Sequence, residues 1–169
     1  MTDRAIDEAR RVRRQHNCRD PFRIAAEEEI EVLVRDDFVR QKGAFCVVEG
    51  YPFIMLNGSL PEEEQRTVCA HELGHALLHR DVAQKGAICE FDLYNMSTDV
   101  EYEANVFASE LLIDPQELRD CLSEGMDVYA AAGELGVNVN LLLIKLAELN
   151  RRGGRYNLLY VPDKGFLGE

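Results

Sequence analysis

The spacing of apolar residues in the first part of the chain predicts two helices. Residues 3–16 carry apolar side chains three apart among charged ones, which is typical of an amphipathic helix. Asp20 followed by Pro21 indicates a helix start, because aspartate caps free N–H groups and proline suits the first turn. We therefore expect a second helix over residues 21–29.

Short runs of apolar and β-branched residues predict strands. One covers residues 30–34, and two more, at residues 44–48 and 53–57, flank a Glu-Gly-Tyr-Pro turn and so predict a hairpin. A free strand edge can hold an extended peptide as an added strand. We expect residues 53–57 to supply such an edge beside the helix that follows.

Two longer helices are predicted next. Ser59 is expected to cap the first, which has glutamates in its first turn and continues through residues 68–79. The second is expected to begin near Asp99, with apolar positions three and four apart, and to end at Asp114. Between them, residues 81–97 show no clear period and are expected to form a loop.

The C-terminal part of the chain predicts two helices, over residues 128–135 and 140–149, separated by a tight Gly-Val turn. The pair resembles a helix-turn-helix. Within its second helix Lys145 is the only basic side chain, whereas proteins that read DNA bases need several polar or basic groups. This favours packing or partner recognition over direct DNA binding. Residues 156–161 are expected to form a last strand.

Composition restricts the class of protein. The chain has 169 residues, which suits one compact domain, and a formal net charge of −12 from 19 basic and 31 acidic residues. This charge argues against a broad nucleic-acid-binding surface, because phosphate contacts need clustered Lys and Arg. The arginines at residues 10–14 are expected to be solvated or to dock against acidic segments of the protein itself.

The sequence shows neither a targeting signal nor a disulfide framework. Its apolar runs are shorter than the roughly 20 residues that span a bilayer, and the N-terminus lacks the apolar core of a signal peptide. The five cysteines are odd in number and never spaced as Cys-x-x-Cys, which is typical of free thiols in a reducing compartment. These features favour a cytoplasmic protein that does not bind a membrane.

The sequence His71-Glu72-Leu73-Gly74-His75 is the strongest chemical signal. Residues four apart project from one face of a helix, so His71 and His75 can offer two imidazoles to one ion. Glu72 can reach a water molecule at that metal, and imidazole and carboxylate ligands suit zinc. A surface helix with a polar histidine face fits less well, because the flanking residues are uncharged and unpaired polar groups among them are costly.

A third ligand must come from elsewhere in the chain. His79 lies eight helical residues beyond His71, a separation of about 12 Å, so it is expected to orient a ligand or to lie at the helix end. Glu101 is favoured as the third ligand, because Asn105 lies one turn beyond it and can hold the second nitrogen of a histidine. Glu103 is the alternative ligand.

These motifs together resemble the ImmA/IrrE family of metallo-endopeptidases. The resemblance rests on the segment from His71 to His79 and on the segment from Glu101 to Leu112. The Asp-Pro-Phe-Arg-Ile-Ala sequence at residues 20–25 also resembles the opening of that family. The chain departs from the family where Ile-Asp-Pro stands in place of the Met-Pro that often follows its Leu-Leu.

Motifs and resemblance together predict an α+β fold with a zincin-like core, in which a small antiparallel or mixed sheet accompanies the HExxH helix. Residues 1–125 are expected to form the metallopeptidase domain, and residues 126–169 a C-terminal helical, helix-turn-helix-like region packed on it. One Zn²⁺ ion per chain is expected, with Glu72 as the general base. The resemblance implies the partner, a helix-turn-helix repressor whose cleavage relieves repression of a phage or mobile element.

Two other functions stay open. The chain can act without proteolysis, by sequestering a repressor or by binding DNA. It can also hydrolyse small amides as peptide deformylase does, but that pattern needs a cysteine ligand in a glycine-containing motif, which Cys46 does not match. For the endopeptidase, Tyr102 and His79 are the candidate groups for stabilising the oxyanion.

Overall fold

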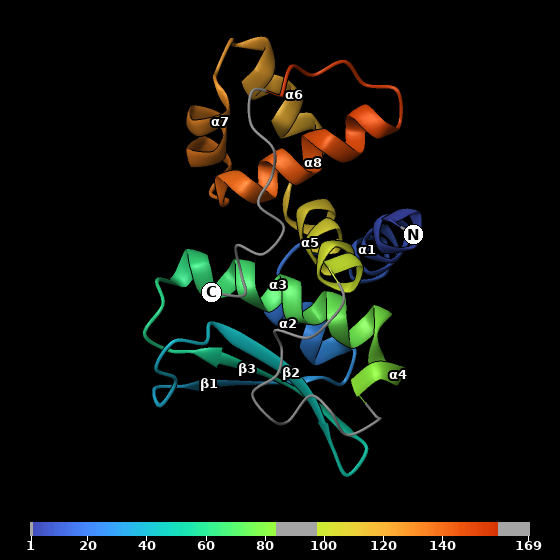
Figure 1. Ribbon diagram of the computed structural model, residues 1–169, viewed down its shortest axis with the longest axis vertical. Helices are drawn as coiled ribbons and strands as arrows, with labels where there is room; N and C mark the ends of the chain where they lie inside the picture. Colours follow the sequence, from blue (N-terminus) through green and yellow to red (C-terminus); the bar gives the residue numbers. More distant parts are fainter. Residues whose placement is uncertain (1, 84–97, 159–169) are drawn as a thin grey trace.

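The computed structural model describes residues 2–83 and 98–158, which form an α+β fold around a small sheet and a central helix (Figure 1). Within these residues the sheet consists of β1 (Glu31–Arg35), β2 (Gly43–Val48) and β3 (Tyr51–Asn57). β3 lies in the middle, parallel to β1 and antiparallel to β2. The predicted α+β class with a small mixed sheet is confirmed.

The central position of β3 corrects one prediction. Residues 53–57 were expected to supply a free edge, but β3 is paired on both sides. The edge next to the long helix belongs to the other strand of the hairpin, β2, which packs against α3 (Glu62–Leu78). The prediction was wrong because local patterns identify strands but do not reveal a parallel partner such as β1, which comes from outside the hairpin.

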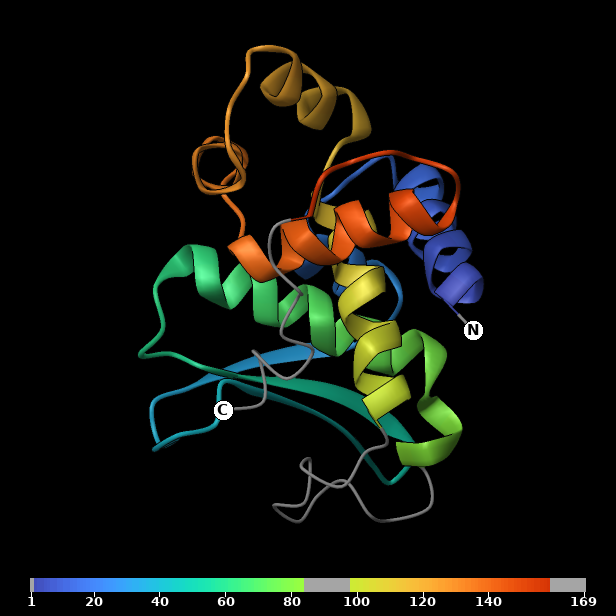
Figure 2. The same ribbon diagram turned by 45° about the horizontal axis from the view of Figure 1, so that its top comes forward.

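Helix α3 covers one face of the sheet (Figures 1 and 2). Ile54 and Leu56 alternate with more exposed side chains along β3, and both are fully buried in the core. Gly43 lets β2 approach the helix closely, because a Cβ atom at this position would lie 2.4 Å from Cγ1 of Val68 on α3. The edge strand therefore lies directly against the helix that carries the HExxH motif.

The start of α3 differs from the prediction. Pro61, not Ser59, occupies the N-cap position, and no side chain forms a cap hydrogen bond there. The acidic side chains of residues 62–64 lie in the first turn, where they interact favourably with the helix dipole. From there α3 continues unbroken through the metal-binding motif to Leu78.

On its other side α3 packs against α5 (Thr98–Leu112), the helix that carries the second predicted motif. α5 is covered in turn by α1 (Thr2–His16) and α8 (Val139–Arg151), while α2 (Pro21–Glu27) packs against α3. Figure 2 shows α5 between α3 on one side and α1 and α8 on the other. The predicted loop over residues 81–97 begins instead as a short helix, α4 (Arg80–Ala83), and its remainder lies outside the described residues.

A helix that was not predicted, α6 (Pro115–Ser123), follows α5. It precedes α7 (Val128–Leu135) and α8, which form the predicted helical pair across a 109° bend. No described helix is by itself long and apolar enough to cross a bilayer, and only α7 and α8 taken together pass on length and composition. The predicted strand at residues 156–161 is absent over residues 156–158, and its remaining residues lie outside the described part.

Candidate metal centre

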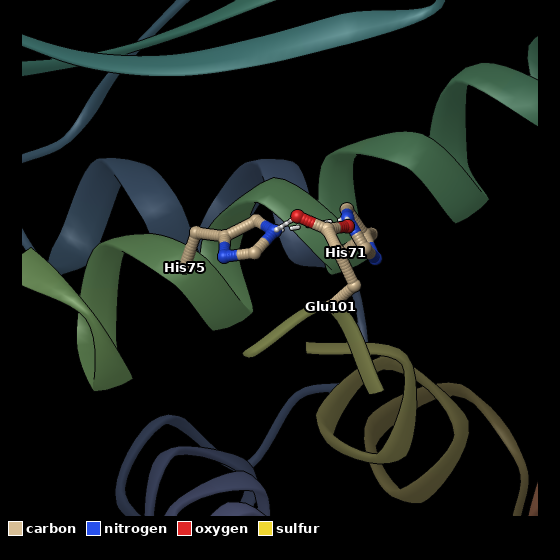
Figure 3. Close-up of side chains that lie close together, drawn as sticks. All are labelled: His71, His75 and Glu101. Carbon is tan, nitrogen blue, oxygen red and sulfur yellow. Dashed lines mark hydrogen bonds and ion pairs between the residues drawn. The ribbon is translucent and has the colours of Figure 1, made fainter. Parts of the chain in front are cut away.

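His71 and His75 lie one turn apart on α3, and Glu101 reaches both from the first turn of α5 (Figure 3). The Nε2 atoms of the two histidines are 3.0 Å apart. The carboxylate oxygens of Glu101 lie 3.2 Å from Nε2 of His71 and 3.4 Å from Nε2 of His75. One ligand atom from each residue falls within 4.8 Å of the others, so the structure brings together the three residues predicted as ligands.

The second ring nitrogen of His71 is held by Asn105. Nδ1 of His71 lies 2.9 Å from Oδ1 of Asn105, and both side chains are buried. Because an amide oxygen accepts hydrogen bonds, Nδ1 of His71 carries the proton in this contact. Burial opposes protonation of His71, but its contact with the carboxylate of Glu101 raises the pKa of the ring. In the neutral form of His71, the lone pair of Nε2 lies on the side of Glu101.

The second ring nitrogen of His75 is held by a longer chain of contacts. Nδ1 of His75 lies 3.2 Å from Nδ1 of His79, whose Nε2 lies 3.1 Å from Oε2 of Glu103. Nε2 of His79 donates a hydrogen bond to the Glu103 carboxylate, and in that tautomer Nδ1 of His79 accepts one from Nδ1 of His75. Nε2 of His75 is thereby left as a lone-pair donor, and Glu103 is directed to His79 rather than to the histidine pair.

The electrostatics of this cluster favour a bound cation. Burial opposes ionisation of Glu101, yet its contacts with His71 and His75 hold the pKa of the carboxyl below its usual range. Burial lowers the pKa of His75 to about 4 and so favours its neutral form. Two buried imidazole nitrogens and one ionised carboxylate are a donor set that suits a divalent transition metal and leaves a coordination position open.

Glu72 lies beside the three converging residues and is held by the edge strand. Its carboxylate accepts a hydrogen bond from the backbone N–H of Phe45 on β2, and burial raises its pKa to about 7. Within the described residues, Oε2 of Glu72 is buried without a hydrogen-bond partner. An unpaired buried carboxylate oxygen is costly, and a catalytic role is one reason for a protein to keep it, so this atom is a candidate proton acceptor.

The two candidate oxyanion donors are both engaged elsewhere. The hydroxyl of Tyr102 donates to Oε1 of Glu148 on α8 at 3.1 Å. Burial, with the nearby carboxylate of Glu148, raises the pKa of Tyr102 to about 12. His79 is held between His75 and Glu103. Neither side chain is therefore directed at the position between His71 and His75, where an oxyanion would need a donor.

Two features of β2 were missed by sequence reasoning. Phe45 acts through a backbone N–H, which side-chain patterns do not show. Gly43 left a signal, because a glycine at the start of an apolar strand indicates a close approach of another backbone or side chain. A Cβ atom there would lie 3.2 Å from Oε1 of Glu72. By strand alternation Cys46 points to the face opposite Phe45, so it does not provide a deformylase-type ligand.

Comparison with known proteins identifies the family of this chain. A peptidase family described as the IrrE N-terminal-like domain matches residues 25–147. The chain is also 31% identical over 103 residues to uncharacterized immunity region protein 2 of Bacillus phage phi105, an alignment that covers 61% of this chain and 64% of that relative. The chain thus spans less than two thirds of the relative's length. Because the family match covers most of the sequence and both α3 and α5, this chain belongs to the IrrE N-terminal-like domain family.

Proposed function

We propose that this protein is a zinc-dependent endopeptidase in which His71, His75 and Glu101 hold the ion. The observation that carries the proposal is the convergence of one ligand atom from each of these residues within 4.8 Å, beside a buried carboxylate with an unpaired oxygen. Membership of a peptidase family supports a metallopeptidase. A zinc ion held by these residues would lower the pKa of a bound water molecule and polarise a carbonyl group.

Glu72 is the general base and acid in this proposal. Its Oε2 atom, which has no partner among the described residues, accepts a proton from the attacking water and later delivers it to the leaving amine nitrogen. The N–H of Phe45 fixes the carboxylate while this happens. Because burial raises the pKa of this carboxyl group, Glu72 binds a proton more readily than an exposed glutamate does.

The edge of β2 is the proposed binding site for the peptide. Among the described strands β2 pairs only with β3, and Phe45 on the same strand contacts Glu72. An extended substrate that adds to this edge through backbone hydrogen bonds would place one of its peptide bonds beside the histidine pair. β2 therefore takes the role that was expected of residues 53–57, which are paired on both sides.

The proposed substrate is a helix-turn-helix repressor that controls a phage or mobile element in the cytoplasm. The motif resemblance and the immunity-region name of the phage relative support this partner. The C-terminal helices offer few free basic side chains that could bind DNA. Lys145 is 2% exposed and paired with Glu110, and Arg151 and Arg152 both contact Asp3.

The test uses the purified, zinc-loaded protein and the repressor encoded beside its gene. Incubation should produce two discrete repressor fragments, identified by mass, and a chelator should prevent their formation. Loss of DNA binding by an intact repressor would point to sequestration instead. Hydrolysis of formylated peptides but not of the repressor would favour the small-amide hydrolase.

A further inference from the structure

A cavity separate from the metal centre lies against α1. It has a volume of about 600 Å³, and four arginines line it together with Glu110 at the far part of α5. Glu110 is nine residues from Glu101, a distance of about 13 Å along the helix axis. The four arginines are Arg10, Arg13, Arg14 and Arg19. Such a concentration of positive charge is unexpected in a chain with a net charge of −12.

The carboxylate of Glu110 in the lining of the cavity is shared between two cations. Oε1 of Glu110 lies 2.7 Å from Nε of Arg10, and Oε2 of Glu110 accepts a hydrogen bond from Nζ of Lys145. Lys145 is almost fully buried, so it requires this negative charge for itself. Glu110 therefore leaves much of the charge of Arg10 available to a ligand.

The remaining arginines are also incompletely neutralised. Arg13 contacts Asp114, but Asp114 also accepts hydrogen bonds from two backbone N–H groups at the start of α6. Arg19 is matched by Glu117 through two bonds of 2.8 Å. Arg14 is exposed and has no hydrogen-bond or ion-pair partner among the described residues. Four arginines and a buried lysine thus share only three carboxylates, and the excess charge is positive.

The lining of the cavity indicates what kind of anion fits. Its described lining contains no aromatic side chain that could stack on a nucleobase, and its apolar part is limited to Cys18 and Pro115. The arginine forks already bind three carboxylates of the protein itself, so carboxylate is the chemistry that this surface accommodates. A cavity of about 600 Å³ has room for several side chains rather than for one small ion.

We propose that this arginine-lined cavity binds an acidic peptide segment of a partner protein through its carboxylates. Arginine clusters are a recurrent means of recognising acidic motifs. The four arginines precede residue 25, where the family match begins, so the cavity is formed in part by residues outside the matched region. The proposal does not depend on peptide hydrolysis, because the metal centre plays no part in the binding.

The test measures binding of a fluorescent peptide with glutamate at alternate positions to the full chain by fluorescence anisotropy. An ionic strength of about 0.15 M shortens the Debye length to about 8 Å, which screens repulsion from the acidic surface but not direct contacts. Saturable binding of this peptide, and none of its glutamine counterpart, is expected. Equal binding of the two peptides, or no saturable binding of either, would overturn the proposal.

Matched substitutions on α1 locate the binding site. Arg14→Gln removes a lining arginine that holds no carboxylate of the protein, and it should weaken peptide binding about tenfold, as loss of one charge-assisted hydrogen bond predicts. Arg4→Gln makes the same charge change at an exposed position of the same helix outside the cavity and should have little effect.

Two controls accompany the binding measurement: the thermal stability of both variants, and the binding of other anions. Both variants should unfold at the same temperature as the wild-type protein, so that a difference in binding reports the cavity. Equal weakening by both substitutions would show a general charge effect and reject the site. Tighter binding of duplex DNA or inorganic pyrophosphate than of the glutamate peptide would likewise reject an acidic peptide as the ligand.

Discussion

Oδ1 of Asn105 lies 2.9 Å from Nδ1 of His71. Asn105 is one helical turn beyond Glu101 on the same helix, α5. α5 thus supplies both a candidate ligand and the group that orients another. The packing of α5 on α3 therefore determines the geometry of the metal centre. Gly74 makes this packing close, because a Cβ atom there would lie 3.2 Å from Phe107 on α5.

The ligand set predicts a specific pattern of zinc loss. His71→Ala, His75→Ala and Glu101→Ala should each abolish binding of the single ion, measured as zinc content after dialysis. Glu103→Ala should keep the ion with an affinity about 10- to 100-fold lower, because Glu103 acts only through His79. Retention of zinc by Glu101→Ala together with its loss from Glu103→Ala would show that the third ligand has been assigned to the wrong glutamate.

Gly43→Ala should disturb the contact between β2 and Glu72. Its new methyl group would meet Val68 at 2.4 Å, so the free energy of unfolding should fall by about 1–3 kcal/mol. Turnover should fall while zinc content stays unchanged, because Phe45 moves away from Glu72 but the three ligands do not depend on β2.

The control for Gly43→Ala is Gly133→Ala, at a helical glycine of α7 where a Cβ atom has nothing within 4 Å. Helix propensity predicts that this change leaves stability unchanged or raises it by up to about 1 kcal/mol, with normal turnover. If Gly43→Ala behaved in the same way as Gly133→Ala, close packing of β2 would not be what positions Glu72.

The buried pair between Glu110 and Lys145 predicts an asymmetry in stability. Glu110→Ala leaves the lysine buried without a counter-charge and should lower the free energy of unfolding by about 3–5 kcal/mol. Lys145→Met should cost clearly less, because Glu110 keeps its contact with Arg10. Urea unfolding measures both. A larger cost for Lys145→Met would mean that Arg10 does not compensate Glu110.

Recognition of a folded partner is expected to involve the C-terminal helices. Deletion of residues 127–169 would test this poorly, because α8 contributes buried side chains such as Leu141 and Ile144 to the core. Tyr129 on α7 is 58% exposed and offers a milder change. Tyr129→Ala should slow cleavage of the intact repressor several-fold and leave cleavage of a peptide spanning the same bond unchanged. Equal effects on both substrates would exclude remote docking at this residue.

Local patterns predicted most helices and strands, because their apolar periodicity and their start and stop signals lie within short segments. The omission of α6 was avoidable. Asp114 and Pro115 repeat the start signal of Asp20 and Pro21, and the same two residues also end the preceding helix. The pairing of β3 was not available locally, because its parallel partner comes from outside the hairpin.

The metal centre was predictable to the extent that it follows helical spacing. Residues four apart place His71 with His75, and Glu101 with Asn105, on common faces. The link from Glu103 through His79 depends on how α3 and α5 pack against each other, which spacing within one helix does not determine. The contact from Phe45 to Glu72 uses a backbone group, which every residue except proline carries, so no residue type could indicate it.

The most direct measurement compares the wild-type protein with Glu72→Gln, both zinc-loaded, on the intact repressor, with fragments identified by mass. The substitution keeps the size of the side chain but removes the proton acceptor. Zinc content should therefore be unchanged, and cleavage should slow by a factor of roughly 10² or more. Normal cleavage by Glu72→Gln, or relief of repression by the wild-type protein without any fragment, would contradict a peptidase that uses Glu72 as its base.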